Sequence, residues 1–306
     1  MGGPYASKVA GLGGLPTVGV DVPICAIFLV LFISGAVGHM TTFQINRRRG
    51  HKFIPSAATF GFCMSRTVAC IIRIVWACYP HNVSLAIAAQ IFVAAGVLIL
   101  FILNLLYAQR MVRAAFPRIG WSLAVSWSFK ALYAITVVSI IMLITVVIQS
   151  AYTLNANTHR IDRDIQVYGV TYFAIVSFLP LPIVLALLLF TRGRQIESPG
   201  HGSWAAKGAI VITAAVLLCL GASFRAATTW MPPRPATNPP PYDHKACFYI
   251  FDFGIDITVV MLFLFARVDK RFWVPNGSSQ VRHYRGVEEP VEELKELKEK
   301  VDVEKL

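Results

Sequence analysis

Charged side chains interrupt otherwise apolar segments of this sequence. Arg66 and Arg73 lie in one hydrophobic run, Arg225 in another, and Asp252 with Asp256 in a third. A charge at bilayer depth costs roughly 3 kcal/mol or more, so such residues usually pair with one another or line a polar cavity. Ion pairing and recognition of an anionic group are therefore the two kinds of chemistry that these residues offer.

The spacing and depth of these residues predict which of them meet. Arg66 and Arg73 are seven positions apart, two helical turns, so they share a helix face. Asp252 and Asp256, four apart, do the same. At 1.5 Å per residue, Arg73 lies roughly 9 Å below the outer end of its run, and Arg225 lies at a similar depth. We expect a ladder whose upper rung joins both arginines to Asp252. Its lower rung, near the middle of the membrane, joins Arg66 to Asp256.

Two interpretations of this ladder remain open. In the structural one, the pairs only fix the register of the helices, since buried ion pairs often serve specificity. In the functional one, three arginines face two aspartates, so one guanidinium is left for a ligand phosphate or carboxylate. Gln90 and Asn104, on the third apolar run, are further candidates for the polar lining of such a site.

The apolar runs that carry these residues are long enough to cross a membrane. Hydrophobic residues make up 56% of the chain and charged residues only 14%, with a mean hydropathy of +0.61. A soluble domain carries about a quarter charged residues. Seven runs of about 20 residues, the length of a membrane span, lie at 21–44, 55–79, 85–107, 130–149, 167–190, 209–230 and 248–268. The predicted fold class is all-α, an integral membrane bundle of seven transmembrane helices.

Basic residues in the loops predict the orientation. Counting Lys and Arg gives about fifteen in the loops and tail assigned to the inside and about five outside, which places the N-terminus outside and the C-terminus in the cytosol. The same distribution accounts for the formal net charge of +12 without nucleic-acid binding. The cluster Arg47, Arg48 and Arg49 follows the first run, which favours an uncleaved span over a signal peptide.

Three regions are expected along the chain. Residues 1–19, rich in glycine, form a disordered outer tail; 20–273 form the membrane domain; and 274–306 form a charged cytosolic tail that is partly helical. The outer loop at 231–242, MPPRPATNPPPY, predicts an extended polyproline-type cap over the outer mouth. Pro180 and Pro182 predict a kink in the fifth run.

Several kinds of site lack the residues that they need. Of the seven histidines only His39 lies in an apolar run, and no C-x-x-C pair is present, so neither a metal nor a cofactor is expected. An enzyme is not the favoured class, although Asp252 and Asp256 remain a candidate acid and base. Cys78 and Cys247 lie near the outer ends of their runs, where a disulfide between them is geometrically feasible.

Several motifs resemble those of known proteins. They are Ser65-Arg66 with Arg73-Ile74-Val75-Trp76, Gly96-Val97-Leu98 before Asn104-Leu105, Arg110 with Arg113 and Pro117, and Phe224-Arg225 with Tyr249-Ile250-Phe251-Asp252. Over most of 60–273 the chain resembles a group of uncharacterised fungal seven-span proteins labelled family-C-like G-protein-coupled receptors. More distantly, Phe224-Arg225 and Phe251-Asp252 resemble motifs of the fungal lipid-translocating exporter and toxin-resistance proteins, which also have seven spans.

The leading hypothesis is a receptor-like sensor in the plasma membrane or an endomembrane, surrounded by membrane lipids. An outer-facing polar site lined by Arg73, Arg225 and Asp252 would bind a small or lipidic ligand. The basic inner loops and the charged tail would contact a cytosolic signalling partner. The alternative is a lipid or amphiphile translocator, in which the ladder marks a headgroup path. Below the lower rung the polar candidates are only Asn104 and His39, which favours the sensor.

Overall fold

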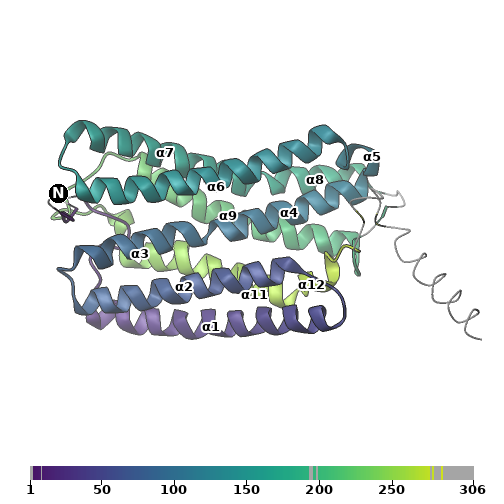
Figure 1. The fold of residues 1–306 in the computed structure, drawn as a ribbon, viewed down its shortest axis with the longest axis horizontal. Helices are drawn as coiled ribbons and strands as arrows, with labels where there is room; N and C mark the ends of the chain where they lie inside the picture. Colours follow the sequence, from purple (N-terminus) through teal and green to yellow (C-terminus); the bar gives the residue numbers. More distant parts are fainter. Residues whose placement is uncertain are drawn as a thin grey trace, which may run out of the picture.

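Helices running side by side along the long axis make up the computed structural model of the protein (Figure 1). It describes residues 3–7, 9–192, 196–197, 199–275, 278 and 284, and no β-strand occurs among them. The helices are α1 (Val18–Arg48), α2 (Ile54–Cys78), α3 (Val83–Gly96), α4 (Leu98–Ala115), α5 (Pro117–Gly120), α6 (Leu123–Tyr152), α7 (Ala156–Phe178), α8 (Pro180–Phe190), α9 (Trp204–Trp230), the short η1 (Pro241–Asp243), α10 (Lys245–Phe248), the π-helix η2 (Tyr249–Gly254), α11 (Ile255–Phe265) and α12 (Val268–Arg271).

Seven helical segments in the described part of the chain are long and apolar enough to cross a membrane. They are Val18–Arg48, Ile54–Cys78, Val83–Ala115, Leu123–Tyr152, Ala156–Phe190, Trp204–Trp230 and Lys245–Phe265. Each contains most of one predicted run, so the prediction of an all-α fold with seven such helices is confirmed. This architecture is compatible with an integral multi-pass membrane protein.

The fourth and fifth segments begin earlier than predicted because capping residues precede their apolar stretches. The Ser122 hydroxyl accepts a hydrogen bond from the Val125 amide at 3.4 Å, and the Asn155 side chain accepts one from the Asn157 amide at 2.9 Å. Such caps satisfy amides that have no partner in the first helical turn. Helix therefore starts among polar residues that hydropathy alone leaves out.

Three of the seven segments are interrupted. The fifth breaks between α7 and α8 at Leu179, directly before Pro180, as the two prolines predict. The third breaks between α3 and α4 at Val97, after Gly96, and no proline announces it. The seventh contains the π-helix η2, a wide turn of a kind that often lies at functional sites. Val97 and Leu179 keep right-handed helical backbone angles, so the third and fifth segments each continue in the helical direction past the break.

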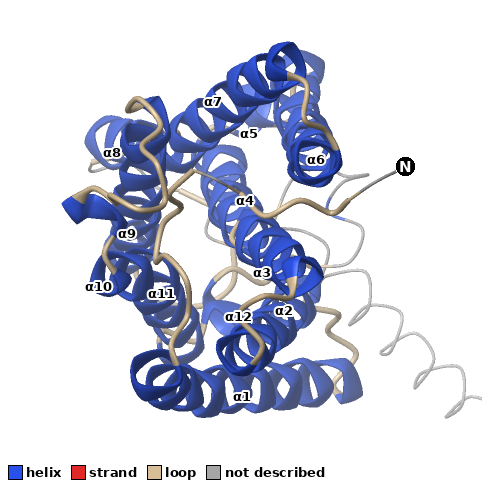
Figure 2. Ribbon diagram, turned by 90° about the vertical axis from the view of Figure 1, so that its left-hand side faces the viewer, coloured by secondary structure: helices blue, strands red, loops and turns tan. Residues whose placement is uncertain are grey.

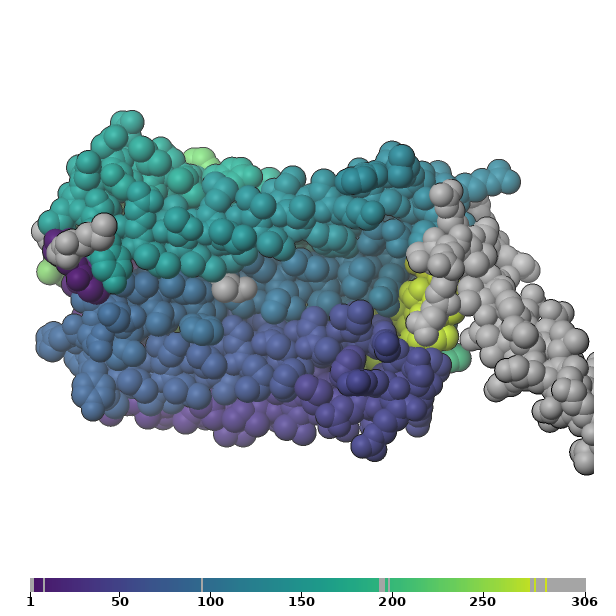
Figure 3. All heavy atoms as spheres, in the orientation of Figure 1, coloured from purple at the N-terminus to yellow at the C-terminus, as the bar shows by residue number. Residues whose placement is uncertain are grey.

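The helices pack in an order that brings distant parts of the chain together. α1 packs along α2, α7 packs against α6 and α9, and α11 packs against both α1 and α9 (Figure 2). In the space-filling view, the part of the chain that includes α1 and α2 forms one side of the molecule, and the part that includes α6 and α7 forms the other (Figure 3). The seventh segment is therefore the element that joins the first segment to the sixth.

Large apolar side chains lie both inside and on the outer surface. Phe32, Phe62 and Phe253 are completely buried between α1, α2 and η2, where the Phe32 ring makes T-shaped contacts with the other two rings. In contrast, Leu189 is 74% and Phe190 69% exposed. A water-soluble bundle does not normally present so many large apolar side chains outward, whereas a hydrocarbon environment favours them.

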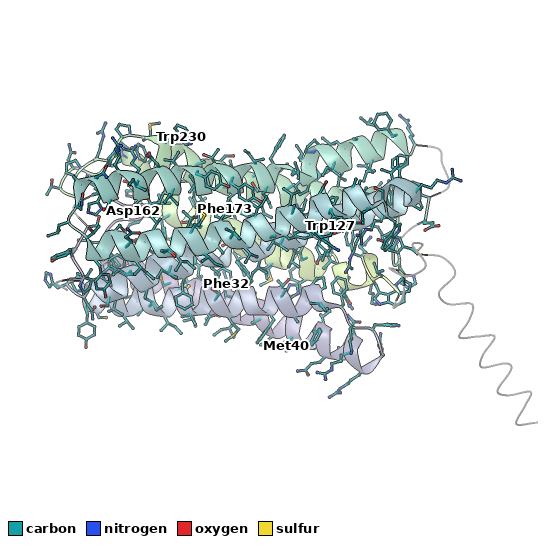
Figure 4. The ribbon with its side chains drawn as sticks, turned by 45° about the horizontal axis from the view of Figure 1, so that its top comes forward. Phe32, Met40, Trp127, Asp162, Phe173 and Trp230 are labelled. Carbon is teal, nitrogen blue, oxygen red and sulfur yellow. The ribbon has the colours of Figure 1, made fainter. Side chains whose placement is uncertain are left out.

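The N-terminus and α12 lie at opposite ends of the bundle (Figure 1), as an odd number of spans requires. Asp162 and Trp230 lie toward the end that carries the N-terminus, and Trp127 lies toward the other (Figure 4). We refer to these as the N-terminal end and the opposite end. Most of the predicted charged tail at 274–306 lies outside the described residues.

Candidate functional site

Arg66 of α2 and Asp256 of α11 form an ion pair inside the bundle. Arg66 Nε donates to Asp256 Oδ2 at 2.7 Å, and the two side chains are 0% and 1% exposed. Arg66 Nη1 also donates to the Val93 carbonyl of α3 at 2.9 Å. A Cβ added at Gly96 would lie 3.3 Å from Arg66 Cζ, so glycine leaves room for the guanidinium where α3 ends. The lower rung of the predicted ladder is confirmed.

Arg225 of α9 and Asp252 of η2 form a second pair. Arg225 Nε donates to Asp252 Oδ1 at 2.5 Å; the aspartate side chain is 1% exposed and the arginine 20%. The rings of Phe224 and Phe251, the residues just before them, stack with centroids 4.0 Å apart. A Cβ at Gly221 would lie 3.0 Å from the Phe251 carbonyl oxygen, so this glycine allows α9 to approach the π-helix closely. This half of the predicted upper rung is confirmed as well.

The prediction that Arg73 joins Asp252 is wrong. Arg73 Nη2 lies 2.9 Å from Oδ1 of Asp21, three residues into α1. Arg73 Nε also donates to the Tyr249 hydroxyl at 3.1 Å, and Nη2 donates to the Gly13 carbonyl at 2.9 Å. The physical reason is which helices are neighbours. α2, which carries Arg73, packs along α1, whereas Asp252 pairs with Arg225 of α9.

Asp21 belongs to the buried charge network, although the sequence analysis did not include it. Its carboxylate accepts hydrogen bonds from the Thr17 amide at 2.7 Å, from Lys245 Nζ at 2.5 Å and from the Tyr249 hydroxyl at 2.7 Å, besides those from Arg73. A signal was present, because Asp21 lies about 4.5 Å into its helix and Arg73 about 7.5 Å into the adjacent one. The two should therefore have been considered as partners.

The expectation of a spare arginine is also wrong. With Asp21 included, each of Arg66, Arg73 and Arg225 has its own carboxylate. The remaining positive charge belongs to Lys245, which shares Asp21 and is 22% exposed at the N-terminal end. Any ligand acid must therefore compete with, or add to, an existing ion pair.

A cavity of about 60 Å³ lies beside Arg225 of α9 and Asp256 of α11, one member of each ion pair. Arg225 and Asp256 are its charged lining residues, and apolar side chains of α4, α6, α7 and α9, such as Phe101, Leu143 and Phe173, complete it (Figure 4 labels Phe173). Of the Arg225 nitrogens, only Nε has a hydrogen-bond partner among the described residues. By volume the cavity has room for about four water molecules. It therefore offers guanidinium donors in a small, mainly apolar space.

The weaker polar candidates do not line this cavity. Gln90 is exposed on the surface of α3. Asn104 is 1% exposed and donates from Nδ2 to the Val211 carbonyl at 3.3 Å. His39 has Nε2 3.1 Å from the Val260 carbonyl oxygen. Each of the last two side chains has one helix carbonyl partner, while Asn104 Oδ1 and His39 Nδ1 are buried without a partner among the described residues.

The N-terminal segment and the proline-rich loop together cover the N-terminal end of the bundle. We expected a disordered tail, but its described residues make contacts: the Ala10 amide donates to the Arg234 carbonyl at 2.8 Å, and the Gly13 amide donates to the Asp243 carbonyl at 2.9 Å. Val9 forms an isolated antiparallel bridge with Pro235. Burial raises the pKa of the Asp243 carboxyl above its ordinary value. This double layer separates Arg73 from solvent.

At the opposite end, the loop between α11 and α12 is fixed by a separate ion pair. Asp269 is 4% exposed and accepts hydrogen bonds from Arg267 and from Asn46 of α1, each at 3.0 Å. Burial alone would raise the pKa of the Asp269 carboxyl, but these two hydrogen bonds outweigh it and lower that pKa below its ordinary value. Arg267 is held at φ 49°, a left-handed conformation unusual for arginine.

The cysteines and acidic residues suggest no covalent or metal centre. Cys78 is an exposed free thiol and Cys247 a half-buried one, so the feasible disulfide between them is not formed in this structure. Over the described ranges, no group of three or more His, Cys, Asp or Glu residues is arranged to hold a metal ion. The charged groups of the site are guanidinium and carboxylate groups.

Comparison with known proteins adds one match. Residues 201–273 match a family model described as "Protein of unknown function (DUF3112)". That stretch includes Arg225, Asp252 and Asp256, and hence the upper pair and both charged residues of the cavity. No curated protein and no solved structure is significantly similar to this chain.

Proposed function

We propose that this protein is a receptor-like membrane sensor whose ligand places a carboxylate or phosphate in the central cavity beside Arg225. The carrying observation is that Arg225 lines the cavity with only one of its three nitrogens hydrogen bonded within the described chain. A guanidinium with free Nη groups is suited to bidentate recognition of such acids. A cavity of about 60 Å³ admits the acid group of a small or lipidic ligand rather than a whole lipid.

The two ion pairs next to the cavity, Arg225–Asp252 and Arg66–Asp256, determine how the protein would respond to the ligand. An acid bound at Arg225 competes with Asp252, which lies in the wide turn of η2, and adds negative charge beside Asp256. Both aspartates belong to the seventh segment, which contacts α1 and α9. Val97, where the third segment breaks, also lines the cavity. Displacement of these elements would carry the signal to the basic loops at the opposite end and to a cytosolic partner.

The distribution of polar groups supports a sensor over a lipid translocator. A headgroup path needs polar groups that are free to solvate the headgroup from one end of the bundle to the other. Beyond the Arg66–Asp256 pair, Asn104 and His39 are each 1% exposed, and each has one helix carbonyl partner. Asn104 Oδ1 and His39 Nδ1 are buried without a partner among the described residues, so a translocator would have to expose these atoms along an open route.

A binding experiment tests the proposal. Full-length protein in detergent is titrated with a fatty acid and with a lysophosphatidic acid, and with the fatty alcohol and monoacylglycerol of the same chain as neutral probes. We expect the acids alone to raise the unfolding midpoint, because a ligand that binds only the folded state stabilises it. Arg225→Gln should abolish the shift. Arg163→Gln should retain it, because Arg163 is a half-buried arginine that donates to the Met231 carbonyl and does not line the cavity.

Two outcomes would contradict the sensor. Equal shifts with acidic and neutral probes would remove the role of Arg225. Rapid transfer of a fluorescent lipid between leaflets of reconstituted vesicles, lost in Arg66→Ala but not in Arg163→Gln, would establish the translocator instead.

A further inference from the structure

A groove of about 440 Å³ opens on the outer surface of the bundle beside η2 and α11. Gly254 and Thr258 line its middle, with Phe28 of α1 on one side and Leu217 of α9 on the other. Figure 2 shows α11 between these two helices. All of these residues lie in segments apolar enough to cross a membrane, so the groove faces the depth of the lipid chains.

The groove is hollow because of residue size along one helical face. Ile250, Gly254 and Thr258 follow one another at four-residue spacing, and only the first, 59% exposed, is large. The Thr258 hydroxyl donates to the Gly254 carbonyl at 2.7 Å, so it presents no unpaired donor to the groove. Ile250 and Thr258 are about 12 Å apart along the axis. This shape fits an extended stretch of one acyl chain.

Positive charge lies at the N-terminal mouth of the groove. Tyr249 lines the groove and donates its hydroxyl hydrogen to Asp21 at 2.7 Å. Lys245, about one turn earlier in the same segment, contacts the other oxygen of Asp21 and is 22% exposed. Because Arg73 also pairs with Asp21, two cations share one carboxylate and the cluster carries a net charge of +1.

We propose that this groove is a binding site for one anionic phospholipid, with an acyl chain along Gly254 and Thr258 and the phosphate beside Lys245. Lipid chains are as apolar as the groove, so the chain binds through packing, and the headgroup preference comes from the uncompensated charge. This site is separate from the Arg225 cavity and does not depend on the function proposed for it.

Photocrosslinking tests the site. Full-length protein in detergent is mixed with phosphatidylglycerol or phosphatidylcholine carrying the same diazirine-labelled chain, irradiated, and digested for peptide mass mapping. We expect adducts on the stretch from Ile250 to Thr258, with phosphatidylglycerol favoured about fivefold, the preference that one basic residue gives at a membrane surface.

Variants make the test specific. Thr258→Leu should fill the groove and remove these adducts. Thr145→Leu is the matched control, because Thr145 is also an exposed threonine that donates to the carbonyl four residues earlier, at 2.8 Å. Lys245→Gln should abolish the preference between the two lipids, and Arg225→Gln should leave both results unchanged. Adducts spread equally over α6 and α11, or equal labelling by the two lipids in the unmodified protein, would overturn the proposal.

Discussion

Arg73 Nη2 lies 2.9 Å from Asp21 Oδ1, and this contact joins the second helix of the bundle to the first turns of α1. Asp252, at a depth similar to that of Arg73, instead contacts Arg225. The carboxylate that an arginine contacts therefore depends on which helices are neighbours. The depth of the arginine in the bundle only limits the possible partners. Arg66, Arg73 and Arg225 are each held by a carboxylate from another segment.

A double-mutant cycle distinguishes these partners. Arg73→Gln and Asp21→Asn should show a coupling free energy of about 1–3 kcal/mol, because each substitution removes the same contact. Arg73→Gln and Asp252→Asn should be additive within about 0.5 kcal/mol. Unfolding midpoints in detergent measure both cycles. Strong coupling to Asp252 and none to Asp21 would reverse the assignment.

The Arg66–Asp256 pair should be costly to break on one side only. Arg66→Leu leaves the Asp256 carboxylate buried without its cation, so we expect a loss of about 3–5 kcal/mol in unfolding free energy. The double variant Arg66→Leu with Asp256→Leu removes both charges and should recover much of that loss. Equal destabilisation by the single and double variants would show that the two residues act independently.

Two neighbouring glycines at the N-terminal end give a matched test of the covering segment. Gly13 and Gly14 have φ of +79° and +53°, so alanine is strained at either position. A Cβ at Gly13 would lie 2.7 Å from Phe248 Cγ, whereas a Cβ at Gly14 meets nothing within 4 Å. Gly14→Ala should cost about 1–2 kcal/mol. Gly13→Ala should cost about 1–3 kcal/mol more because it also displaces Phe248.

Thermal unfolding of both variants measures the difference. Equal midpoints would mean that the segment around Gly13 does not pack on Phe248 and Arg73 in solution.

The Asp269 carboxyl makes stability depend on acid pH. Its folded pKa lies below the ordinary value of 3.8. A lowered folded pKa contributes stability that is fully present above the ordinary value and is lost as the pH falls through the folded pKa. Asp269→Asn should therefore lower the unfolding midpoint at pH 6 and flatten its fall below pH 4. An unchanged slope in this variant would assign the acid dependence to other carboxyls.

Much of the fold could be predicted from the sequence because the hydropathy of a segment depends only on the residues of that segment. Each apolar run is long enough to span, and a charge within it, such as Arg66 or Asp256, must find a partner. The break before Pro180 was likewise predictable, since proline removes a backbone hydrogen bond. These features need no knowledge of which helices are neighbours.

The missed features all depend on neighbours. Asp21 looked like the boundary of the first run, and only the packing of α1 on α2 makes it the partner of Arg73. The break at Val97 accompanies a contact between Arg66 and the Val93 carbonyl, which the third run does not reveal by itself. The roles of Lys245 and Tyr249 follow from the same packing.

The wide turn at Tyr249–Gly254 holds one residue more than an α-helix would over the same rotation. Deleting a single residue within 249–254 would restore α geometry, and the helix on either side would keep nearly the same rotation about its axis, because the lost residue and the tighter turn offset each other. Asp256 would keep its place beside Arg66, whereas Asp252, inside the turn, would lose its direction toward Arg225. One codon therefore decides whether the seventh helix is bound to the sixth at the charged centre of the bundle.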